Sequence, residues 1–145
     1  MTRHAAREEA FKIIFQVDLG KNSWSETLSR NLKDLSLSEE SRLFLKQLVE
    51  GTMTHLVEID AEISKYAQEW KLDRMLSTDR NILRMALFEL KYQKDIPAGV
   101  TVNEAVELAK VYGDDDSGRF INGILGNIIR SSGLTKDEAE IKQDT

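Results

Sequence analysis

The chain has 145 residues, of which 41% are hydrophobic and 31% are charged, and such a chain is typical of one globular domain. It contains no cysteine, which excludes a disulfide framework, a thiolate zinc site and a cysteine nucleophile and favours the reducing cytoplasm. No apolar run is long enough for a membrane span or a secretory signal. The formal net charge of −5 provides no global attraction for nucleic acid, although a local basic patch can persist in an acidic protein.

Apolar residues in the first half of the chain recur at spacings of three and four, which predicts amphipathic helices. The first helix is expected over residues 3–19, with Gly20 ending it. Ser23 and Ser38 can accept a backbone hydrogen bond at the start of the second and third helices. The same period then continues past Gly51, which either breaks or merely bends the helix there.

The second half begins with the most apolar helix, predicted to be the central one, with Ser77 as its cap. Its buried face comprises Ile82, Leu83, Ala86, Leu87 and Leu90. Thr101 and Glu104 fit a capping box that opens the next helix. A polar connector over residues 114–118 then precedes a last helix that begins at Arg119.

No alternation typical of strands extends beyond a few residues, so the predicted fold class is all-α with about seven helices. Residues 1–132 are expected to form a single domain. Residues 133–145 are charged and offer few apolar anchors, and we expect them to be a disordered tail.

A search for catalytic patterns finds no Gly-rich nucleotide loop, no HExxH pattern and no interpretable Ser, His and Asp set. The acidic run at residues 114–116 could hold a hard cation, but its acids are contiguous and lack the glutamate that a calcium loop requires. A solvated loop that caps the following helix is the favoured interpretation.

The N-terminal helix carries a short basic face. Arg3 and Arg7 are four residues apart, so both could project from one side and hold adjacent phosphates. Glu8 and Glu9 dilute this charge, and an ordinary solvated surface is favoured when the helix is considered alone.

Two residues of the later helices have more than one interpretation. Phe120 could stack on an unpaired base while Arg119 takes the phosphate, although core packing is favoured on local grounds. Arg84 lies on the most apolar helix and is expected to pair with a carboxylate such as Glu104 or Asp79, or to bury its stem along the helix edge.

Four stretches of the chain together resemble the NusB family of transcription antitermination factors. They are residues 6–18 (AREEAFKIIFQVD), 79–90 (DRNILRMALFEL), 96–110 with VNEAVELAK, and 119–125 (RFINGIL). The order and spacing match nearly to residue 131, and the last two stretches together are specific.

This resemblance implies seven helices in two packed subdomains and a role without catalysis or cofactor. Members of the family bind a short single-stranded boxA RNA together with NusE, a small-subunit ribosomal protein. The pair joins other Nus factors and RNA polymerase in antitermination complexes that support ribosomal RNA transcription. Both monomers and homodimers occur in the family.

The resemblance also assigns residues. The RNA-binding set that it implies is Arg3, His4, Arg7, Phe15, Asp116 and Phe120. Beside this set, Arg119 or Lys110 is expected to hold the RNA backbone. Asp79, with Arg80 beside it, corresponds to a surface that contacts NusE. Because the net charge is negative, RNA binding is expected to be cooperative with a basic partner.

Three other functions remain open from the sequence. The same helical fold precedes some ribosomal RNA methyltransferases, although a Gly-rich cofactor motif is absent here. A helical adaptor that binds only proteins would use the surface around Asp79. A metal-dependent enzyme would use residues 114–116.

Overall fold

The computed structural model describes residues 2–67 and 70–132 of the chain. Within these ranges the structure is helical and contains no strand, which confirms the all-α fold class with seven α-helices and one short 3-10 turn. The elements are α1 (Arg3–Gly20), α2 (Trp24–Asp34), α3 (Glu39–Thr54), α4 (Leu56–Ala67), η1 (Leu72–Arg74), α5 (Ser77–Tyr92), α6 (Ala98–Tyr112) and α7 (Ser117–Ser132). The expected tail at residues 133–145 lies outside the described residues, so the domain boundary stays a prediction.

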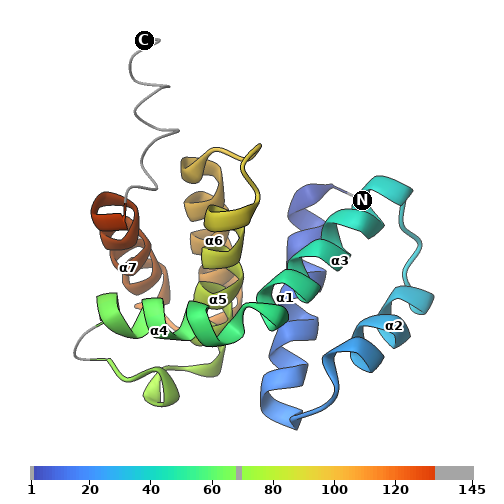
Figure 1. Ribbon diagram of the computed structural model, residues 1–145, viewed down its shortest axis with the longest axis horizontal. Helices are drawn as coiled ribbons and strands as arrows, with labels where there is room; N and C mark the ends of the chain where they lie inside the picture. Colours follow the sequence, from blue (N-terminus) through green and yellow to red (C-terminus); the bar gives the residue numbers. More distant parts are fainter. Residues whose placement is uncertain (1, 68–69, 133–145) are drawn as a thin grey trace.

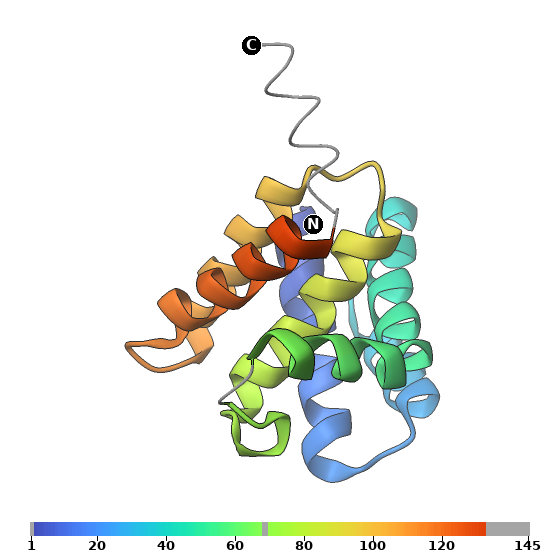
Figure 2. The same ribbon diagram turned by 60° about the vertical axis from the view of Figure 1, so that its left-hand side comes forward.

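The helices form two groups, with α1, α2 and α3 on one side of the molecule and α4 to α7 on the other (Figure 1). Helix α5 contacts α1 and α3 of the first group as well as α4, α6 and α7 of the second. The turned view in Figure 2 shows the antiparallel pair of α6 and α7 projecting beside α5. No helix in the described ranges combines the length and the hydropathy that crossing a membrane requires.

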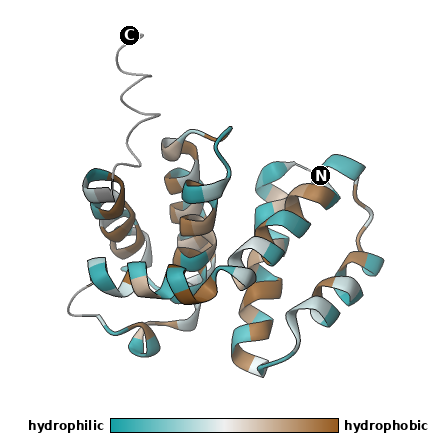
Figure 3. Cartoon of the chain, viewed as in Figure 1, coloured by the Kyte–Doolittle hydropathy of each residue, from teal (hydrophilic) through white to brown (hydrophobic). Residues whose placement is uncertain are grey.

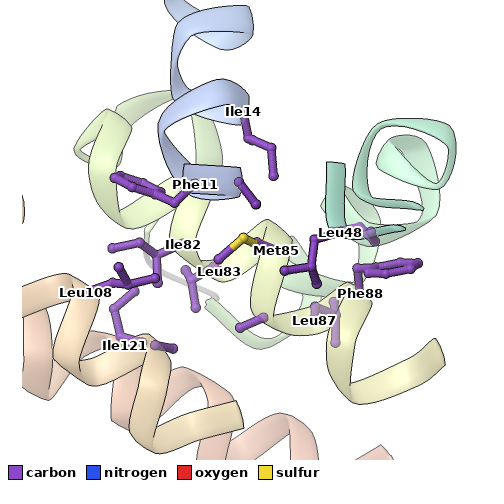
Figure 4. Packing of buried hydrophobic residues seen from close by; sticks show 14 of the residues in the cluster. Phe11, Ile14, Leu48, Ile82, Leu83, Met85, Leu87, Phe88, Leu108 and Ile121 are labelled. Atoms are coloured by element: carbon purple, nitrogen blue, oxygen red, sulfur yellow. The ribbon is translucent and has the colours of Figure 1, made fainter. Parts of the chain in front are cut away.

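Helix α5 is buried on every side over residues 81–89, as expected for the central helix of a domain. Its apolar side chains serve two packing layers, which Figure 4 shows. Ile82 faces Leu108 of α6 and Ile121 of α7, whereas Met85 lies toward Leu48 of α3. In Figure 3 the hydrophobic residues of α6 and α7 gather where these helices face each other. One continuous core therefore joins both groups.

Several helix ends confirm the sequence prediction and others correct it. The side chains of Ser23 and Ser38 accept hydrogen bonds from the backbone of Glu26 and Ser41, as expected for caps. The first helix is expected to stop at residue 19, before Gly20. In the structure Gly20 is the last residue of α1, and the following residue, Lys21, adopts the left-handed conformation with φ of 53°.

Three helix starts differ from the prediction. Ser77 is already inside α5, where Leu76 occupies the cap position without a side-chain hydrogen bond. Helix α6 begins at Ala98, directly after Pro97, so Thr101 is a buried residue of its first turn and the proposed capping box is wrong. The fixed φ of proline starts this helix earlier than the Thr and Glu pattern indicated. Helix α7 begins at Ser117, two residues before the expected position.

Gly51 neither breaks α3 nor ends it. A Cβ atom at this position would lie 2.0 Å from Cζ of Phe88 on α5, and other ring atoms would be closer than 3 Å. The missing side chain therefore allows α3 and α5 to approach closely.

We expect Gly51→Ala to lower the free energy of unfolding by about 1–3 kcal/mol, because the buried Phe88 ring has to move. The matched control is Gly123→Ala in α7, where a Cβ atom meets nothing within 4 Å. That variant should gain up to about 1 kcal/mol from helix propensity. Urea unfolding of both variants tests the prediction, and equal stability of the two would contradict it.

Candidate nucleic-acid interface

The loop between α6 and α7 brings three predicted RNA-binding residues into one cleft. The cleft has a volume of about 550 Å³ and is lined by Trp70, Arg74, Met75, Leu76, Asp79, Asp114, Asp116, Arg119 and Phe120. Asp79, expected on a separate partner surface, therefore lies in the same cleft as Asp116, Arg119 and Phe120.

Local hydrogen bonds hold the loop in shape. The side chain of Asp114 accepts from the backbone of Asp116 at 2.9 Å and from Oγ of Ser117 at 3.1 Å. The same Ser117 oxygen accepts from the backbone of Asp114 at 3.0 Å. Asp116 and Arg119 have exposed side chains, so they are available to a ligand. Nowhere in residues 2–67 and 70–132 do three His, Cys, Asp or Glu side chains cluster as a metal site requires.

Phe120 lies at the edge of the core and also lines the cleft. Its ring packs edge-on against Trp70, with 5.7 Å between the ring centroids and 77° between the planes. Trp70 is 58% exposed, which is a large apolar surface to leave in water. Phe120 is partly buried against the core, as expected on local grounds, and it also lines the cleft, while its stacking on a base stays a prediction. Sequence reasoning missed Trp70 because it lies between helices, outside any apolar period.

Asp79 is the buried acid of the cleft, with only 6% of its surface exposed. Burial raises the pKa of Asp79, and the nearby charge of Asp114 adds to the effect, while a hydrogen bond with Ser117 opposes it. Its Oδ1 atom has no hydrogen-bond partner among the described residues. The wall of the cleft therefore contains a buried acceptor that the fold leaves without a partner.

The N-terminal arm lies elsewhere, beside the start of α6. The exposed guanidinium of Arg3 is 3.6 Å from Asp95 and 4.7 Å from the centroid of the Phe44 ring. Nδ1 of His4 lies 2.6 Å from a carboxylate oxygen of Glu104, and this contact raises the pKa of His4. Arg3 and His4 are both accessible to a phosphate.

Arg7 is not part of that exposed face, and the expectation that Arg3 and Arg7 present adjacent exposed guanidinium groups is wrong. Its side chain is 5% exposed and binds Glu89 with two hydrogen bonds, of 2.8 and 3.3 Å. Glu104 lies 3.5 Å from a third guanidinium nitrogen, and Thr101 donates to Glu89. The four-residue spacing does place Arg3 and Arg7 on one side of α1. That side is exposed at Arg3, but at Arg7 it packs against α5 and α6, so Arg7 connects α1 with these two helices.

Arg80 and Arg84 also have structural partners. Arg80 donates to Oδ2 of Asp18 at 2.7 and 3.1 Å and to the carbonyl of Leu72 at 3.1 Å. Arg84 binds Asp60 at 2.8 and 2.9 Å, so neither Glu104 nor Asp79 is its partner. Burial alone would raise the pKa of Asp18, but hydrogen bonds from Asn81 and Arg80 lower it below its ordinary value.

Phe15 is half-buried on α1, where its ring lies 5.8 Å from that of Phe11. Phe11 in turn lies 5.1 Å from Tyr112 at the end of α6. Phe15 is not among the residues that line the cleft. Lys110 is exposed on α6, 3.6 Å from Glu107.

The model of the NusB family matches residues 4–130 of this chain. A curated transcription antitermination protein NusB of Desulforamulus reducens is 48% identical, and the alignment covers 96% of this chain and 94% of the relative. The protein of that name from an Exiguobacterium species is 47% identical, with coverage of 90% and 98%.

Solved structures agree with the sequence comparison. A structure of T. maritima NusB superposes with a TM-score of 0.85 at 33% identity and covers 94% of this chain and 98% of the other. A crystal structure of the antitermination factors NusB and NusE in complex with dsRNA superposes with a TM-score of 0.80 at 30% identity, with coverage of 90% and 99%.

Replacing Arg7 by alanine should lower the free energy of unfolding by about 3–5 kcal/mol, because Glu89 would remain buried without a cation. Arg3→Ala removes an exposed arginine of the same helix and should change stability by less than about 0.5 kcal/mol. Thermal or urea unfolding measures both. If Arg7→Ala is as stable as Arg3→Ala, the structural role assigned to Arg7 is wrong.

The raised pKa of Asp79 predicts a pH-dependent stability difference. Below the ordinary value of 3.8 the carboxyl is protonated in both the folded and unfolded states. As the pH rises through the raised folded-state pKa, the folded state loses stability relative to the unfolded state. Asp79→Asn should therefore gain stability over the natural protein between pH 4 and pH 7, as measured by urea unfolding at both values. A difference that is constant with pH would contradict this assignment.

Proposed function

Because the chain belongs to the NusB family, we propose that it acts as a transcription antitermination factor that binds boxA-type single-stranded RNA together with NusE. NusB is a family of antitermination proteins and not of enzymes, in line with the predicted role without catalysis. The observation that carries the RNA-binding proposal is the open cleft in which Phe120, Arg119 and Asp116 converge. In the cytoplasm, the complex would include other Nus factors and RNA polymerase and would support ribosomal RNA transcription.

The cleft offers the three kinds of contact that an unpaired nucleotide requires. Phe120 provides an aromatic surface for a base, a contact worth about 1–3 kcal/mol. Arg119 has no hydrogen bond or ion pair with any residue that the structure describes, and it can hold a phosphate. The exposed carboxylate of Asp116 can accept hydrogen bonds from base amino groups.

The exposed arm provides a second contact. Arg3 and His4 lie beside Asp95 and Glu104 near the start of α6, whereas Phe120 follows the loop at its end. A strand that contacts both must follow α6, whose 15 residues extend about 22 Å. Phe15, which is half-buried on α1, is proposed as a further contact of this strand. Arg7 is buried and holds the exposed arm in position through its contacts with Glu89 and Glu104, and it does not contact RNA.

The partner contact proposed for Asp79 adjoins the RNA contact proposed for Phe120, so NusE and RNA would meet at the cleft. Arg80 contributes by holding η1 against α1 and α5, since its guanidinium is occupied by Asp18 and Leu72. An acidic protein binds RNA weakly by itself, and a basic ribosomal protein would supply the missing charge.

Phe120→Ala should lower the affinity for a boxA-like single strand by about 5-fold to 150-fold, which corresponds to one lost stacking contact. Fluorescence anisotropy of the labelled RNA, with and without NusE at two salt concentrations, measures the affinity. The control is Tyr92→Ala, which removes a partly exposed aromatic residue at the end of α5, away from the cleft.

Binding of the natural protein should weaken with salt, because phosphate contacts release counterions. Equal affinities of the Phe120 and Tyr92 variants would remove the cleft from the proposed interface. If the natural protein binds no RNA under any of these conditions while its circular dichroism remains helical, the protein is an adaptor that binds only proteins.

A further inference from the structure

We propose that the bound RNA strand continues beyond Phe120 into the groove between α4 and α7, where Trp70, Asn127 and Arg130 hold a further segment of several nucleotides. The inference rests on the proposed function, because it extends the strand that the cleft would bind. It assigns an RNA-binding role to residues outside the set considered so far.

The groove is open and continuous with the cleft. Its volume is about 470 Å³, and it is lined by Tyr66, Ala67, Trp70, Arg119, Phe120, Gly123, Ile124, Asn127 and Arg130. Three of these residues, Trp70, Arg119 and Phe120, also line the cleft. Helices α4 and α7 contact each other (Figure 1). Because the two sites share Trp70, Arg119 and Phe120, a strand that passes over Phe120 from the cleft reaches the groove.

The two neighbouring sites differ in charge. The cleft is lined by three carboxylates, those of Asp79, Asp114 and Asp116, and by two arginines, Arg74 and Arg119. Among the described residues that line the groove there is no carboxylate, and there are two arginines, Arg119 and Arg130. Arg130 donates to the neutral side chain of Asn127 at 2.7 Å, so this contact leaves its charge uncompensated. In a protein of net charge −5, such a local excess of cations is suited to a phosphate backbone.

The groove also has the aromatic surface typical of sites for single strands. Trp70 and Tyr66 come from the end of α4 and the residues after it, and Phe120 comes from α7. Bases of any sequence can stack on such rings while arginines hold the phosphates. An acidic protein segment would also suit the arginines, but it would leave the exposed indole of Trp70 without a matching contact.

Gly123 provides a variant that tests the groove without removing any of its side chains. A Cβ atom at this position meets nothing within 4 Å, and alanine is a better helix former than glycine. Larger side chains can thus enter the groove from an intact helix. Gly123→Glu adds a negative charge there, and Gly123→Lys adds a positive charge of similar size.

The experiment compares RNAs of two lengths by fluorescence anisotropy with NusE present. The short strand contains the boxA-like sequence, and the long strands carry about four more nucleotides at the 5′ or the 3′ end. One of the long strands should bind the natural protein more tightly than the short strand does. Gly123→Glu and Arg130→Ala should lower the long-strand affinity about threefold to tenfold, as for one exposed phosphate contact, and leave the short-strand affinity unchanged.

Two controls isolate the effect of the groove. Gly123→Lys should retain or increase the long-strand affinity, which separates charge from steric hindrance. Arg30→Ala removes an exposed arginine from α2, on the opposite side of the molecule, and should affect neither strand (Figure 1).

Trp70 supplies a direct signal. The chain has two tryptophans, so a Trp24→Phe background makes Trp70 the single emitter. Its emission should be quenched more by the long strand than by the short one, because a further base stacks on it.

The possible outcomes are distinct. If both strands bind equally well, or if Gly123→Glu and Gly123→Lys weaken the long strand equally, the extended path is overturned while RNA binding at the cleft stands. If Trp70 emission responds to NusE alone and not to RNA, the groove is a protein contact and the inference fails. If neither strand binds the natural protein, it is the proposed function that fails.

Discussion

The buried ion pair between Arg7 and Glu89 fixes how the helices are arranged around the candidate interface. Both side chains are at most 5% exposed, and a charge so buried is costly unless its partner is present. Arg7 also approaches Glu104, while Glu89 accepts from Thr101. The pair therefore holds α1 against both α5 and α6. The exposed arm on the first turn of α1 has a defined position because the next turn is held in this way.

A second polar network fixes the other end of α1. Asp18, in its last turns, accepts hydrogen bonds from Arg80 and Asn81 at the start of α5, and Arg84 continues the network to Asp60 on α4. With both ends held, α1 cannot shift relative to α5 without breaking one of these networks. The arm, Phe15 and the cleft therefore keep a constant separation, and this preorganisation lowers the entropic cost of ordering the protein around a long ligand.

Helices and core could be predicted from the sequence because the apolar period is local information, and the serine caps at Ser23 and Ser38 are equally local. The prediction failed where the decisive partner is distant. Nothing near Arg7 in the chain shows that its carboxylate partner lies 82 residues away, so its spacing from Arg3 indicated a shared exposed face. The capping box at Thr101 failed for a local reason, since Pro97 starts α6 earlier, and the contact of Thr101 with Glu89 was not visible in the sequence. Trp70 follows no period at all, and only the packing against Phe120 reveals its position.

The distribution of charge at the interface also restricts how RNA can bind. Three acids accompany the two arginines of the cleft, whereas the described lining of the groove has two arginines and no acid, so the groove attracts a phosphate more strongly. A strand suits both sites best when its bases face the acids of the cleft and its phosphates lie near Arg119, which lines both sites, and Arg130. The acceptors in the cleft then need donor groups on unpaired base edges, since pairing in a duplex already occupies them. The acidic residues thus contribute to selecting a single strand, although they reduce the general attraction for RNA, and the net charge of −5 is compatible with an RNA-binding role.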